Sequence, residues 1–114
     1  MIAAFWWLLF AHLLADYPLQ GDFLAKMKGK NPILLFTHAG IWTGCIVLTL
    51  HLLGYHPFGW MVAFLFVVHA LADVLKARGL FWYRRLDALT WGLLIDQLIH
   101  VAQILSILWM VSAQ

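Results

Sequence analysis

Hydrophobic residues of the chain fall into four long stretches that polar residues interrupt only briefly. The stretches cover residues 2–20, 32–54, 57–77 and 88–112. Each is close to the roughly 20 apolar residues that a helix needs to cross about 30 Å of hydrocarbon, and none shows the strict alternation of a strand. The pattern predicts an all-α integral membrane four-helix bundle, built from two tandem hairpins that form one transmembrane domain over residues 1–114.

Composition supports the membrane prediction. The chain is 65% hydrophobic and 11% charged, whereas soluble domains average about 45–50% apolar and roughly 25% charged residues. A soluble domain of 114 residues cannot hide this much apolar surface. An ordinary cytosolic enzyme and a disordered chain are therefore excluded. The single cysteine, Cys45, also excludes an internal disulfide and a zinc cluster built on thiolates.

The charged residues predict an orientation. Nine of the twelve lie within residues 22–30 and 76–87, and these two segments hold every Lys and Arg. Because cytoplasmic loops of membrane proteins are enriched in Lys and Arg, we expect both segments in the cytoplasm and both termini outside. The expected location is a bacterial inner (cytoplasmic) membrane, crossed several times. Lipids with anionic headgroups, and no nucleic acid, are the expected partners of the basic segments.

The three remaining charges are aspartates inside the predicted spans, where each costs roughly 2.5–3.5 kcal/mol at a helix centre. Each has a histidine four residues away on the same helix face; the pairs are His12–Asp16, His69–Asp73 and Asp96–His100. A rise of about 1.5 Å per residue places all three pairs, together with His38, in the inner half of the bilayer. The sequence therefore predicts one polar centre of seven residues.

An internal repeat accompanies this centre. Residues 11–16 align with residues 68–73 at an offset of 57, and each aligned segment carries the H-x-x-x-D pattern. Both predicted hairpins also have a basic connection on the same side. A two-fold pseudosymmetry axis along the membrane normal follows from two hairpins of the same orientation.

A family resemblance rests on four motifs: residues 12–20 (HLLADYPLQ), His38, His69-x-x-x-Asp73 and Asp96-Gln97-x-x-His100. Over nearly its whole length the chain resembles a family of small bacterial and phage membrane proteins of unknown function. More loosely, the H-x-x-x-D pattern is similar to that of proteins described as membrane-bound metal-dependent hydrolases. This second resemblance implies a metal site and a hydrolytic reaction.

Imidazole and carboxylate together are ligands for Zn, Fe or Mn, so we expect one or two divalent transition-metal ions. The predicted metal ligands are His12, Asp16, His38, His69, Asp73, Asp96 and His100. Such an ion can generate a nucleophile from water for attack on an ester, amide or phosphoester from the membrane. Asp16 and Asp73 are the predicted catalytic residues, as general bases.

Four alternatives stay open at this point. The polar residues can form an interhelical hydrogen-bond network, His38 and His69 can hold a haem, or the aspartates and histidines can line a cation or proton path. The chain can also be an accessory subunit of a larger membrane complex, or a homo-oligomer. His51 and His56 are expected to be interfacial residues, and Gly40, Gly44 and Gly92 to allow close helix contact.

Overall fold

The computed structural model describes residues 2–16, 31–77 and 91–114. These residues form four helices and no strand: α1 (Ile2–Asp16), α3 (Pro32–Leu52), α4 (Gly59–Ala77) and α5 (Trp91–Ser112). The prediction of an all-α protein with four helices is confirmed for this part of the chain. The predicted extension of the first helix to residue 20, the start of the last helix at residue 88 and most of the two basic segments lie outside the described residues.

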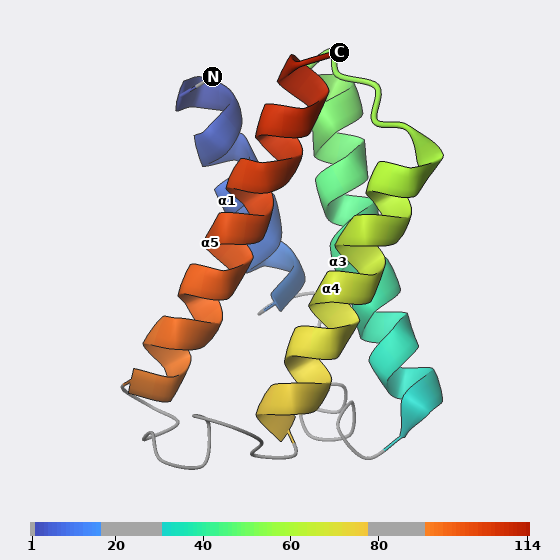
Figure 1. Cartoon of the computed structure of the whole chain (residues 1–114), viewed down its shortest axis with the longest axis vertical. Helices are drawn as coiled ribbons and strands as arrows, with labels where there is room; N and C mark the ends of the chain where they lie inside the picture. The colour runs from blue at the N-terminus through green and yellow to red at the C-terminus, as the bar shows by residue number, and fades with distance from the viewer. Residues whose placement is uncertain (1, 17–30, 78–90) are drawn as a thin grey trace.

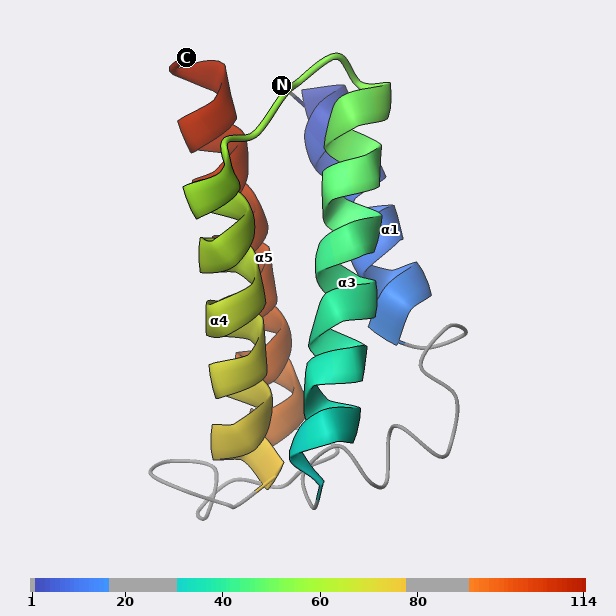
Figure 2. The same ribbon diagram turned by 90° about the vertical axis from the view of Figure 1, so that its right-hand side faces the viewer.

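The helices lie side by side along the long axis of the molecule (Figures 1 and 2). Helix α1 packs against α3 and α5, and α4 packs against the same two helices. Both termini and the connection between α3 and α4 lie at one end, which we call the terminal end (Figure 1). The helix ends near residues 16, 31, 77 and 91 lie toward the opposite end, the loop end.

Helix α3 begins at a well-formed cap. The side chain of Asn31 accepts a hydrogen bond of 2.9 Å from the backbone N–H of Ile33. Pro32 occupies the first helical position, where its missing N–H has no intrahelical partner to lose. These residues fix where α3 begins and, with it, the position of His38 along the helix.

The other end of α3 is closed by a glycine. The helix ends at Leu52, two residues before the predicted end, because Gly54 has a φ of 91°, which is left-handed. The N–H of Gly54 donates to the carbonyl of His51 at 3.0 Å, and the N–H of Tyr55 donates to the carbonyl of Leu50 at 2.9 Å. This pair of bonds is a Schellman closure, which satisfies carbonyls at the helix end and reverses the chain.

The interior of the bundle has two chemically different halves. Toward the terminal end, it is filled by buried apolar side chains, among them Leu8, Ile46, Leu50, Leu65, Ile104 and Ile107. Toward the loop end, the buried side chains include four histidines and two aspartates. These buried histidines and aspartates thus form a polar region inside the described bundle.

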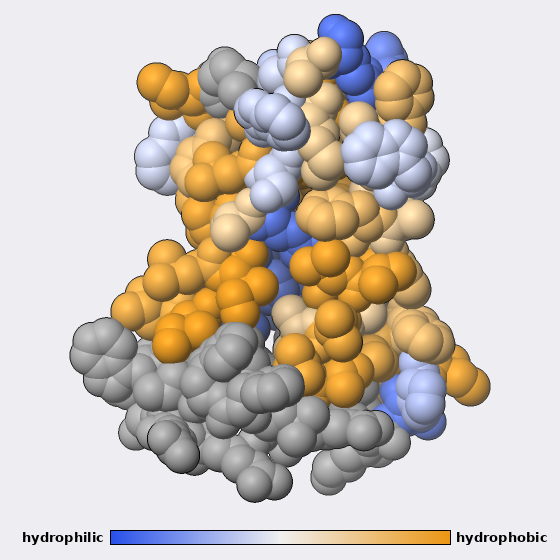
Figure 3. Space-filling model, viewed as in Figure 1, coloured by the Kyte–Doolittle hydropathy of each residue, from blue (hydrophilic) through white to orange (hydrophobic). Residues whose placement is uncertain are grey.

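The surface is apolar. Large hydrophobic side chains are exposed on all four helices, for example Trp6, Phe36, Val67 and Leu98. Figure 3 shows apolar side chains over much of one face, with a narrow hydrophilic seam between α5 and α4. Two helices, residues 32–52 and 94–112, are long and apolar enough to cross a membrane, and two shorter apolar helices cover residues 2–16 and 59–75.

The expected role of two glycines is wrong for the described residues. A Cβ placed at Gly40 or Gly44 meets no atom within 4 Å. These glycines therefore do not serve a close contact between helices of the described bundle. The side chains of the first residues of α5, including position 92, are outside the description.

Candidate metal centre

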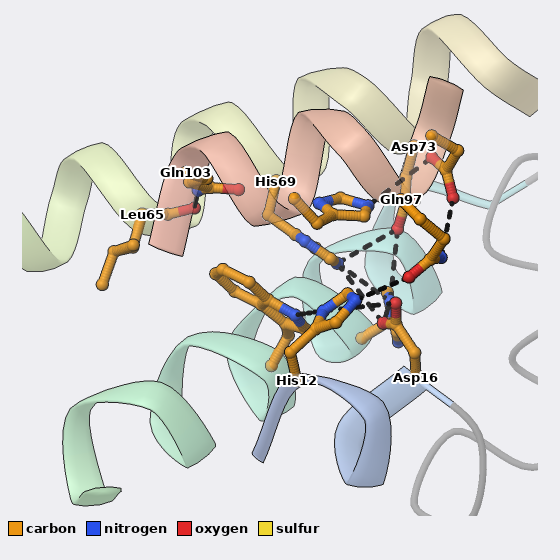
Figure 4. A network of polar contacts seen from close by, with 11 residues as sticks. His12, Asp16, Leu65, His69, Asp73, Gln97 and Gln103 are labelled. Atoms are coloured by element: carbon orange, nitrogen blue, oxygen red, sulfur yellow. Dashed lines mark hydrogen bonds and ion pairs between the residues drawn. The ribbon is translucent and has the colours of Figure 1, made fainter. Parts of the chain in front are cut away.

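All four helices contribute to one buried polar network toward the loop end of the bundle (Figure 4). The seven residues singled out from the sequence lie in it: His12, Asp16, His38, His69, Asp73, Asp96 and His100. Six of them are at most 3% exposed, whereas the side chain of Asp16 is 12% exposed. Sequence spacing thus located the network correctly.

Three of these residues converge most tightly. The Nε2 atoms of His38 and His69 are 3.0 Å apart. Oδ2 of Asp73 lies 3.2 Å from Nε2 of His38 and 3.4 Å from Nε2 of His69. Helices α3 and α4 supply this triangle, with the His69–Asp73 pair one helical turn apart on the same face.

Asp16 approaches the same two nitrogens from α1. Its Oδ1 lies 3.5 Å from Nε2 of His38 and 4.0 Å from Nε2 of His69. The carboxylate of Asp16 is therefore farther from the histidines than that of Asp73, and it is also more exposed. The two predicted catalytic aspartates consequently occupy unequal positions.

The contacts around these two nitrogens outnumber the protons that the nitrogens can donate. Each Nε2 atom carries at most one proton, and a carboxylate only accepts, yet five contacts of 3.0–4.0 Å connect the two nitrogens with each other and with the two oxygens. A tetrahedral metal shell with bonds of about 2.0–2.2 Å places its ligand atoms about 3.3–3.6 Å apart. The distances of 3.2–3.5 Å from Asp73 to both histidine nitrogens and from Asp16 to His38 lie close to that spacing, and the two histidine nitrogens, at 3.0 Å, are nearer to each other. The group could therefore hold a divalent ion. Two carboxylates would also neutralise its charge.

A second group of ligand atoms adjoins the first. His69, Asp73 and His100 offer one ligand atom each within 4.8 Å of one another, as do Asp16, His38 and His69. The ring of His100 lies 4.5 Å from that of His69, and its Nε2 is 3.5 Å from Oδ1 of Asp96. Clusters with the geometry to hold a metal ion are thus present, and they share His69.

The structure places His12 differently from the other histidines. The indole N–H of Trp42 donates to Nδ1 of His12 at 2.8 Å, so this nitrogen carries no proton. Nε2 then carries the proton and donates to Oε1 of Gln97 at 2.9 Å. Both ring nitrogens of His12 are engaged in hydrogen bonds, and His12 is in neither group of candidate ligand atoms. Its predicted role as a metal ligand remains a prediction.

Gln97 connects His12 to Asp96. Its amide oxygen accepts from His12, and its amide nitrogen donates to Oδ2 of Asp96 at 3.4 Å. A chain of hydrogen bonds therefore runs from Trp42 through His12 and Gln97 to Asp96 (Figure 4). This chain fixes the tautomer of His12 and helps to orient a carboxylate beside His100.

Trp42 is the residue of the centre that the sequence analysis missed. Its fully buried indole stacks on the ring of His69, with ring centroids 4.2 Å apart and an interplanar angle of 14°. Trp42 follows His38 by four residues in α3, so helical spacing alone placed it on the same face. In an apolar stretch of sequence, an aromatic residue at a functional centre looks the same as an aromatic residue that only packs.

One further polar residue lies toward the terminal end. Gln103 is 3% exposed, and its amide nitrogen donates to the carbonyl of Leu65 at 2.8 Å. This bond ties α5 to the backbone of α4 one turn from His69. Gln103 therefore helps to hold the two helices that supply His69 and His100.

Comparison with known proteins gives a family. A family model matches residues 4–114. The chain belongs to the DUF3307 family. The family is described as a protein of unknown function, which confirms the resemblance to an uncharacterised family and assigns no reaction. A search of curated proteins and a search of solved structures gave no match.

The geometry of this DUF3307 chain disfavours the haem alternative. A haem iron with one histidine on each face requires room for the porphyrin between the two ligating nitrogens. The Nε2 atoms of His38 and His69 are only 3.0 Å apart, and their ring centroids are 5.1 Å apart. A porphyrin cannot enter between them, whereas a single ion bound by both nitrogens fits.

Proposed function

We propose that this DUF3307 chain is a metal-dependent hydrolase of the bacterial inner membrane that acts on a membrane-derived substrate. Its four helices would cross the bilayer with both termini outside, as the basic segments predict. The distribution of residues supports this, because large apolar side chains lie exposed on all four helices and four of the histidines are buried. Membrane lipids are then the immediate surroundings of the protein.

The single observation that carries the proposal is the triangle of ligand atoms from His38, His69 and Asp73. Catalytic zinc sites use three protein ligands of this kind and leave the fourth position open. An ion held there lowers the pKa of a bound water and so makes a nucleophile available at neutral pH. His38, His69 and Asp73 are the proposed ligands.

Asp16 is the proposed general base. Of the two carboxylates, that of Asp16 lies farther from the histidine nitrogens and is the more exposed, so we assign it to the side of the open position rather than to the triangle. A carboxylate there accepts a proton from the attacking water and can return it to the leaving group. Asp73, the nearer carboxylate, is assigned to metal binding.

The sealed terminal half of the bundle favours this function over transport. A path for cations or protons needs polar groups along its whole length. Between the centre and the terminal end, the described interior is packed with apolar side chains such as Leu50, Leu65 and Ile107. Two buried polar residues, Gln103 and Thr43, also lie there, and Gln103 bonds to a carbonyl of α4. Thr49 and Ser106 bond to carbonyls of their own helices.

Metal analysis tests the proposal most directly. Tag-free protein purified in detergent without chelator should contain about one equivalent of Zn, Fe or Mn, and apo protein should recover it on adding the metal. The loaded protein should then cleave one class among ester, amide and phosphodiester substrates dispersed in the same detergent. Less than about 0.2 equivalents with no recovery would overturn the metal site. Full loading without cleavage of any of the three classes would overturn the hydrolase.

A further inference from the structure

Two histidines outside the buried centre meet at the terminal end. His51 lies in the last turn of α3, and His56 lies in the connection to α4. Both side chains are exposed, and their ring centroids are 5.3 Å apart. The rings of His38 and His69, whose Nε2 atoms converge, are separated by a similar 5.1 Å.

The backbone holds this pair together. The left-handed Gly54 and the two hydrogen bonds of the Schellman closure turn the chain back over the end of α3. A residue with a side chain is strained at a φ of 91°, so glycine makes the reversal possible. The closeness of His51 and His56 therefore follows from the turn rather than from flexible side chains alone.

His51 has one ring nitrogen, Nε2, that can bind a metal ion. Its Nδ1 lies 2.9 Å from the carbonyl oxygen of Val47. Because a carbonyl only accepts, Nδ1 is the protonated nitrogen, and Nε2 carries the lone pair. Metal-binding histidines in proteins are commonly oriented by such a bond from the other ring nitrogen to a backbone carbonyl.

We propose that His51 and His56 form a second, exposed site for a divalent transition-metal ion, with Cu²⁺ and Ni²⁺ bound ahead of Zn²⁺. Imidazole nitrogen suits these ions, and their affinity for nitrogen sites follows that order. With two neutral ligands and water completing the shell, the site would bind more weakly than the buried centre with its carboxylates. The site does not depend on the proposed hydrolase, since the two sets of residues are separate.

Copper titration of tag-free protein tests the second site. The wild type should bind a weaker class of Cu²⁺ whose electron paramagnetic resonance spectrum shows coupling to two nitrogens. His51→Ala and His56→Ala should each abolish that class and leave the tighter class and the folded helicity unchanged. Because both residues are exposed, neither substitution removes packing from the core.

Gly54→Ala tests whether metal binding depends on the turn that holds the two histidines together. It keeps both histidines but strains the turn that joins them, so the affinity of the weaker class should fall by about tenfold or more as the two-point attachment is lost. Unchanged binding in His51→Ala or in His56→Ala would overturn the proposal. If His38→Ala removes the tighter class alone, the two sites are independent; absence of the tighter class from the wild type would count against the hydrolase only.

Discussion

The Nε2 atoms of His38 and His69 face each other across α3 and α4 at 3.0 Å. Two ring nitrogens at this distance need a proton or a metal ion between them, because facing lone pairs repel. Oxygens of Asp73 and Asp16 approach the same point. The centre is therefore defined by the convergence of these nitrogen and oxygen atoms on one position.

Replacement of the ion by Co²⁺ should report the shape of the site. We expect intense visible bands of tetrahedral Co²⁺ in the wild type, since coordination geometry follows the ligand set. His38→Ala and His69→Ala should abolish these bands. His51→Ala, which alters an exposed histidine at the terminal end, is the control and should keep them. Weak octahedral bands in the wild type would contradict a site made by His38, His69 and Asp73.

Substitutions of Asp73 and of Asp16 should separate metal binding from catalysis. Asp73→Asn should lose the ion and all hydrolysis, because Asp73 lies 3.2 and 3.4 Å from the two histidine nitrogens. Asp16→Asn should keep the ion and lower the hydrolysis rate by about 10²–10⁴-fold, the usual contribution of a general base. Metal content and rate are measured on the same samples. Equal loss of metal in both variants would show that Asp16 is a ligand instead.

His12 should tune the site without being required for it. His12→Leu breaks the bonds to Trp42 and Gln97, so the affinity for the ion should fall by about 10–100-fold, as for other residues that orient a metal site. At saturating metal, the stoichiometry should be unchanged. Thr37→Val, which removes an exposed hydroxyl bonded only within α3, serves as the control. A variant unable to load at any metal concentration would return His12 to the ligand set.

Trp42 allows the stacking and the hydrogen bond to be tested apart. Trp42→Phe retains a ring over His69 but loses the donor to His12, whereas Trp42→Leu loses both. We expect a moderate decrease in metal affinity in the first variant and a larger one in the second, with the Co²⁺ bands altered only in the second. Isothermal titration gives the affinities. Identical behaviour of the two variants would exclude a role for stacking.

The apolar half should contribute stability and no metal affinity. Ile46→Ala removes a fully buried side chain, and we expect it to cost about 2–5 kcal/mol of unfolding free energy through lost packing and the cavity left behind. Ile33→Ala changes a side chain that is 74% exposed, so it should cost far less. Denaturant unfolding in micelles measures both. A shift in metal affinity for Ile46→Ala would mean that the two halves are coupled.

Much of the fold and the membership of the network followed from the sequence. The four apolar stretches gave the helices, and the i, i+4 spacing of His69 and Asp73 placed both on one face. The distinction between His12 and His69 did not follow, although both begin the same H-x-x-x-D pattern. It depends on which side chains the neighbouring helices present: the Trp42 N–H reaches His12, while His38 reaches His69.

The ends of the helices were less predictable than their existence. Hydrophobicity continues through Leu53, so the apolar pattern places the end of α3 too late. The helix ends earlier because the left-handed Gly54 closes it with backbone hydrogen bonds, which hydropathy does not encode. Similarly, the glycine spacing at Gly40 and Gly44 suggested a helix contact that the described bundle does not make.

The apolar packing at the terminal end closes the interior of the bundle on that side. Leu8, Leu50 and Leu65 are fully buried there, and they close the interior beyond the histidines. In the described fold, this packing closes the bundle interior between the centre and the terminal end. For the proposed hydrolase, neither substrate nor product would pass through this packing, so a reagent confined to the terminal end would leave turnover unchanged.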